Sequence, residues 1–163
     1  MNPGDLLVRA TIWPAIGLGL AACLGRREGS LWRWGLAFYL VHAAAAFHHV
    51  HGWSHGAAWQ HTARQVQGVV GWESGAGVWV NYGFTLAWVA VAAAGPRLPP
   101  PLARTWRALF VFIAFQGAVV FAPSPARWIA LLGFGLAGGV GLAGRRSRRP
   151  TTGSRGRGGG FVA

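Results

Sequence analysis

Residues 31–61 read LWRWGLAFYLVHAAAAFHHVHGWSHGAAWQH, an apolar run that passes into a polar stretch rich in histidine. Residues 31–50 have the length and composition of a helix that crosses a membrane, which needs about 17 to 25 mostly apolar residues. All histidines of the chain lie between His42 and His61. Histidine is the commonest protein ligand for transition metals. This stretch therefore predicts a membrane-spanning helix and, where that helix ends, the place of a functional site.

The composition of the whole chain is typical of an integral membrane protein. Of its 163 residues 53% are hydrophobic and only 11% are charged, and the mean hydropathy is +0.36. The fifteen basic residues are all arginine, against three acids, which gives a net charge of +12. In a soluble protein this charge would suggest nucleic acid. Here the arginines lie mainly between apolar runs and in the tail, so we expect the lipid bilayer as partner and not nucleic acid.

Five apolar segments are expected to cross the membrane as α-helices, because backbone groups in lipid must be satisfied within a helix. They cover about residues 6–24, 31–50, 78–94, 106–122 and 128–143. The fold class predicted is therefore all-α, a polytopic membrane protein with a five-helix domain over residues 1–144. Residues 145–163 are rich in arginine and glycine with almost nothing apolar to bury, so a disordered cytoplasmic tail is expected there.

The arginines predict the orientation, because short cytoplasmic loops carry an excess of Lys and Arg. Twelve fall on one side of the five spans and three, Arg9, Arg64 and Arg127, on the other. The N-terminus is therefore predicted outside and the C-terminus inside, in a bacterial inner membrane. The run Leu20-Ala21-Ala22-Cys23 also matches a lipoprotein cleavage site. Cleavage there would leave four spans and an arginine-rich tail outside, so we favour the uncleaved chain.

A further helix is predicted between the second and third spans. Ser54 is a good N-cap for a helix over residues 55–70. Val66, Val69 and Val70 recur three and four apart, as on an amphipathic surface helix. We expect this helix to lie along the extracytoplasmic surface of the membrane.

A transition-metal site is predicted where the second span ends. His48, His51 and His55 are three and four residues apart, so they share one face if the helix continues past Gly52. Three neutral imidazoles can hold Cu, Zn or Fe and leave a position for water or substrate. Secondary candidates on the same side are His49, His61 and Glu73.

Haem is less favoured as the cofactor. Haem held between two spans needs histidines on separate helices, and only the second span contains any. His61 or a second copy of the chain would have to supply the other ligand. The runs HHVH and HGWSH look like fragments of the histidine boxes of membrane desaturases and hydroxylases, but those enzymes spread their histidines over several separated boxes.

Two other functions stay open, and neither a reaction nor a substrate is predicted. A small transporter could use intramembrane polar residues, here His42, Asn81 and Gln116. A structural or accessory protein of a membrane complex would need no ligand. Gly135 and Gly139 form a GxxxG pair, which lets helices approach closely in lipid. We expect that pair to pack within the chain, with a homo-oligomer or another membrane subunit as the alternative.

Overall fold

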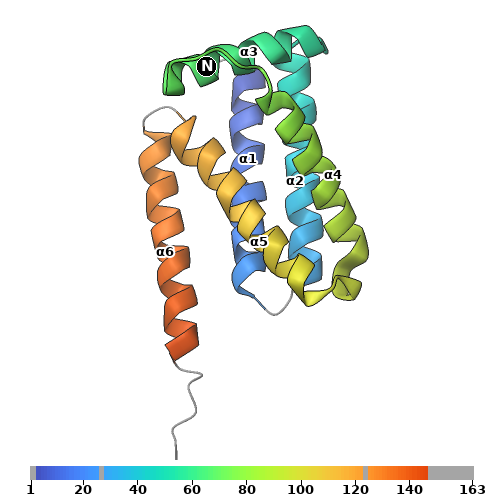
Figure 1. The fold of residues 1–163 in the computed structure, drawn as a ribbon, viewed down its shortest axis with the longest axis vertical. Helices are drawn as coiled ribbons and strands as arrows, with labels where there is room; N and C mark the ends of the chain where they lie inside the picture. The colour runs from blue at the N-terminus through green and yellow to red at the C-terminus, as the bar shows by residue number, and fades with distance from the viewer. Residues whose placement is uncertain (1–2, 26–27, 123–124, 147–163) are drawn as a thin grey trace, which may run out of the picture.

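A computed structural model describes residues 3–25, 28–122 and 125–146, and these residues form helices and short connections without a β-strand (Figure 1). In chain order the elements are α1 (Pro3–Leu24), α2 (Glu28–His49), α3 (His55–Val70), α4 (Gly77–Ala94), the 3-10 helix η1 (Gly95–Arg97), α5 (Pro100–Phe115), the π-helix η2 (Gln116–Val120) and α6 (Ala126–Arg146). The prediction of an all-α fold is confirmed.

Five of the helices run lengthwise and one lies across them. In Figure 1, α1, α2, α4, α5 and α6 alternate in direction, α5 crosses the others obliquely, and α3 lies across one end. α1 begins at this end, which we call the α3 end. α1 ends and α2 begins at the opposite end, which we call the arginine end (Figure 1). The connection from α4 to α5 also lies there, and α6 ends on that side.

Three helices of the described residues are long and apolar enough to cross a membrane. They cover Pro3–Leu24, Gly77–Arg97 and Pro100–Val120. α6 has a shorter apolar part, Ala126–Val140, and α2, which contains Arg33 and three of the histidines, is not among these candidate spans. These three helices indicate a membrane protein.

Most predicted helix bounds agree with the structure within a few residues. The helix predicted over residues 55–70 is present with those bounds, and the Ser54 hydroxyl accepts a hydrogen bond from the Ala57 amide at 3.2 Å. α5 was predicted to begin at Trp106 but begins at Pro100. A proline run ends the preceding helix, yet proline is also well suited to the first turn of the next one, where its missing N–H leaves no bond unmade.

The core is aromatic and lies toward the arginine end. Trp32, Phe84, Trp88, Trp106 and Phe110 are buried and touch one another edge to face or stacked. The Trp88 indole N–H donates to the Trp32 carbonyl at 3.0 Å.

Small residues of α1 allow this aromatic core to approach closely. Ala15, Gly19 and Ala22 are buried on one face of α1. A Cβ atom at Gly19 would overlap the Phe110 ring of α5. Close approach of this kind is the usual role of small residues between membrane helices.

The packing expected of the GxxxG pair within the chain is wrong. A Cβ atom at Gly135 or at Gly139 would meet nothing within 4 Å among the described residues, and Leu136 between them is 73% exposed. This face of α6 points away from the bundle because α6 packs on η2 and α1 through other residues. α6 extends to Arg146, and the rest of the predicted tail lies outside the described residues.

Candidate functional site at the α3 end

The histidine stretch does not form one continuous helix. α2 ends at His49, and Gly52 and Trp53 both have left-handed backbone, with φ of 56° and 59°. Glycine adopts this conformation without steric cost, so Gly52 is where the chain can turn from α2 into α3. The helix continuation past Gly52 is therefore wrong, and the shared face of His48, His51 and His55 is not formed.

Three of the histidines make contacts of their own, and two of them, His48 and His49, also touch each other, with ring centroids 4.5 Å apart. His48 Nδ1 accepts a hydrogen bond from the Trp53 indole at 3.1 Å, which leaves the proton of the neutral ring on Nε2. His55 Nδ1 lies 3.0 Å from the Tyr82 hydroxyl of α4. The His49 ring packs on Gly4 so closely that a Cβ atom there would overlap it.

His51 and His61 face each other. Their ring centroids are 5.2 Å apart and their planes are inclined by 68°. His51 lies in the turn after α2 and His61 in the second turn of α3, so the contact exists because the turn directs α3 across the end of the bundle (Figure 1). Both side chains are half-buried.

One nitrogen of this pair has no partner. His51 Nδ1 is buried and makes no hydrogen bond with the part of the chain that is described. Burial lowers the pKa of His51 below its usual value, and the neighbouring His61 lowers it further. His51 is therefore disposed to be neutral at neutral pH, which is the form of imidazole that binds metals.

The fold brings one pair of imidazoles together from separate elements, His51 and His61, in addition to the sequence neighbours His48 and His49, whose ring centroids are 4.5 Å apart. Within residues 3–25, 28–122 and 125–146, no group of three or more His, Cys, Asp or Glu side chains is arranged to hold a metal ion. Glu73 is exposed in the connection that follows the left-handed Gly71. Metal binding by this end of the molecule stays a prediction, with His51 and His61 as the residues that the fold brings together.

The three polar residues that were predicted to lie within the membrane have different surroundings. His42 Nδ1 lies 2.8 Å from the Val8 carbonyl of α1; since a carbonyl only accepts, this nitrogen carries the proton. Asn81 is exposed near the start of α4. Gln116 is half-buried at the first residue of η2, where its carbonyl accepts from the Phe121 amide.

Tyr82 and the pairing of His51 with His61 were not predicted from the sequence. A polar aromatic residue one turn into α4 is a signal that could have pointed to Tyr82 as a partner for His55. The His51–His61 contact depends on the path of the turn at Gly52, which spacing does not disclose. Comparisons with protein-family models, curated proteins and solved structures found no match.

Proposed function

We propose that the chain is a five-span protein of the bacterial inner membrane, N-terminus outside and C-terminus inside, whose extracytoplasmic end binds a transition-metal ion between His51 and His61. The observation that carries the metal proposal is the contact of these two rings beside a buried Nδ1 without a partner.

The alternation of the five lengthwise helices supports the topology (Figure 1). Because of this alternation, α1, α4 and α6 end and α2 and α5 begin at the arginine end. This agrees with an arginine-rich cytoplasmic side. Trp53, Trp72 and Trp79 are exposed at or near the α3 end. Exposed indoles are enriched at the level of lipid headgroups, so α3 is proposed to lie at the outer interface.

The distance between the two rings suits a shared ion. Zinc and copper bind imidazole nitrogen at about 2.0–2.1 Å, so two imidazoles on one tetrahedral ion have centroids on the order of 5 Å apart. The 5.2 Å separation agrees with that value. Haem is less well supported, because its two axial histidines lie on opposite faces of the ring and do not touch.

The remaining positions of the ion need other ligands. If water, or a carboxylate or imidazole of a substrate, occupied these positions, the ligand could be exchanged, as at catalytic metal sites. Glu73, His48 and His55 are the protein groups proposed as further ligands, and recruiting either histidine would require release of its bond to Trp53 or Tyr82.

Metal content of the purified protein tests the site. The wild type in detergent is expected to hold one Cu, Zn or Fe ion per chain, without the Soret band of haem. The variants His51→Ala and His61→Ala should each lose stoichiometric metal, because each removes one of the two proposed ligands. The control His42→Ala, whose ring bonds to the Val8 carbonyl, should retain it. A wild type that never takes up metal would instead support an accessory protein without a ligand.

Accessibility of engineered cysteines tests the topology separately. In a Cys23→Ala background, a cysteine at Gly68 should react with an impermeant maleimide from outside, whereas one at Pro101 should not. Both positions are exposed in the structure. The reverse pattern would overturn the proposed orientation.

The transporter alternative is less well supported. The bond of His42 to the Val8 carbonyl is the kind of interhelical contact that holds two membrane helices together. The open Gly135–Gly139 face of α6 supports instead a second copy or another membrane subunit as partner.

A further inference from the structure

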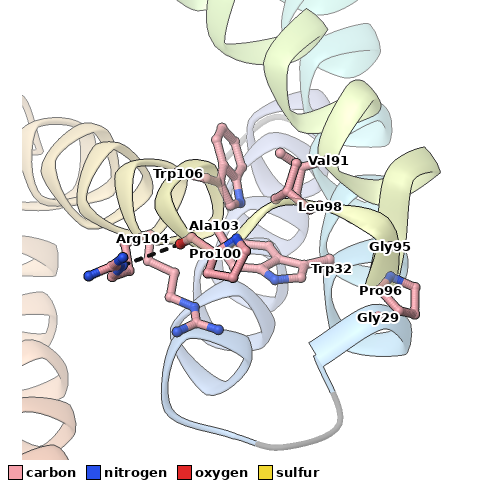
Figure 2. Close-up of a pocket in the computed structure, with 11 residues that line it drawn as sticks. Gly29, Trp32, Val91, Gly95, Pro96, Leu98, Pro100, Ala103, Arg104 and Trp106 are labelled. Carbon is pink, nitrogen blue, oxygen red and sulfur yellow. Dashed lines mark hydrogen bonds between the residues drawn. The ribbon is translucent and has the colours of Figure 1, made fainter.

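A cavity of about 560 Å³ opens at the arginine end between α2, η1 and α5 (Figure 2). Its apolar wall includes Trp32, Val91 and Leu98, and its polar wall includes Arg104, Trp106 and Arg107. This cavity lies at the opposite end from the histidines and shares no residue with the proposed metal site.

The Trp106 indole N–H has no partner at this cavity. The side chain is only 5% exposed, and its Nε1 makes no hydrogen bond within the described residues. Its ring is held by Trp32, with centroids 5.6 Å apart, and is stacked on Phe84 at 5.4 Å. Figure 2 shows the Trp106 ring at the cavity wall, with its nitrogen on the cavity side. A buried donor fixed in this way calls for an acceptor.

Two arginines connect this cavity with a second hollow along α5. Arg104 and Arg107 also line an open groove of about 810 Å³, together with Cys23, Val111, Phe112 and Phe115. Arg104 Nε donates to the Pro100 carbonyl of its own helix at 3.3 Å, and its side chain is exposed. The guanidinium group has further N–H donors, which suit the oxygens of a phosphate.

We propose that these two hollows bind one anionic phospholipid, which is in the cytoplasmic leaflet if the orientation proposed above holds. The phosphate lies at Arg104, Arg107 and the Trp106 N–H, and an acyl chain lies along Val111, Phe112 and Phe115. Charge complementarity selects this occupant: the chain carries +12, and basic pockets between membrane helices on the cytoplasmic side are suited to anionic headgroups. An acyl chain matches the apolar groove, which a soluble phosphate would leave uncovered.

Native mass spectrometry of the full chain in detergent tests the site, with phosphatidylglycerol and phosphatidylcholine as probes. The wild type should prefer phosphatidylglycerol by about 10-fold or more. The pair of changes Arg104→Gln and Arg107→Gln should remove that preference. Trp106→Phe removes the donor and leaves an aromatic but smaller ring at this position, so it should weaken the binding of phosphatidylglycerol by about 5-fold. Thermal unfolding of the same variant measures the packing that is lost with the second ring.

Arg97→Gln is the matched control, because Arg97 is exposed at the same end and lines neither hollow.

Equal binding of the two lipids by the wild type would overturn the proposal. Unchanged binding of phosphatidylglycerol by both Trp106→Phe and the double arginine variant would also overturn it. Displacement of the lipid by millimolar glycerol phosphate would assign the site to a soluble phosphate and would also overturn it. If the double variant does not fold, Trp106→Phe decides. Metal content is a separate measurement, so failure here leaves the metal proposal standing.

Discussion

The two ends of the bundle differ in how sequence distance relates to distance in space. At the α3 end, histidines that are neighbours in the sequence are spread over separate partners: Trp53, Tyr82, Gly4 and one another. At the arginine end, Trp32 of α2, Leu98 after η1 and Trp106 of α5 are far apart in the sequence and meet around one cavity. A cluster in sequence is therefore a poor guide to a cluster in space wherever a turn intervenes, and tight aromatic packing can bring distant residues to one site.

The largest effect is expected from filling the contact between α1 and α5. Gly19→Ala would drive a Cβ atom into the buried Phe110 ring, and overpacking of this kind costs about 1–3 kcal/mol. Thermal unfolding in detergent would measure the loss. Gly17→Ala is the control, because a Cβ atom there meets nothing within 4 Å among the described residues. Equal melting temperatures for the two variants would mean that α1 and α5 are not packed as described.

A second contrast compares two tryptophans that donate hydrogen bonds. Trp88→Phe should destabilise the protein by about 2 kcal/mol, because the Trp32 carbonyl loses its buried donor. Trp53→Phe removes the donor to His48 at a position that is 65% exposed, where water replaces it, so a change under about 0.5 kcal/mol is expected. Chemical or thermal unfolding of both variants measures the difference. Similar losses at the two sites would remove the distinction between a packed arginine end and a solvated α3 end.

The pH dependence of metal binding sharpens the assignment of His51. Only the neutral imidazole binds, so affinity should fall as pH drops through the histidine range near ~6.5. Because burial lowers the pKa of His51, its protonation begins at a lower pH than that of an exposed histidine. We expect a loss of about 10-fold between pH 7.5 and 5.5, measured by titration with Zn against a competing chelator. An affinity that does not change with pH would point to carboxylate ligands.

The smallest effect is expected at the turn between α2 and α3. Gly52→Ala should cost about 1 kcal/mol, because φ of 56° places the new Cβ atom against the backbone. Gly68→Ala is the comparison, since Gly68 is helical, exposed and free of contacts within 4 Å, and should be neutral or slightly stabilising. Thermal unfolding measures both. A stabilised Gly52→Ala variant would contradict the left-handed turn that separates His51 from His55.

Local signals in the sequence predicted most of the helices. Apolar runs of sufficient length indicated α1, α2, α4 and α6, and the Ser54 cap marked the start of α3. The start of α5 was predicted too late, because a proline can either follow the end of one helix or stand in the first turn of the next, and residue type does not distinguish the two. Gly135 and Gly139 were assigned to internal packing, yet small residues show only that a helix can be approached closely and not which neighbour does so.

The sequence by itself determined that this protein is helical, apolar and strongly basic, because composition, periodicity and caps act over a few residues along the chain. Tertiary structure decided which polar groups meet. His61 faces His51 only because the turn after α2 sets the direction in which α3 leaves, and Trp106 lines a cavity only because three distant elements pack there. Such contacts depend on the directions in which whole helices leave their turns. A left-handed residue such as Gly52 changes that direction without altering the spacing of the histidines on either side.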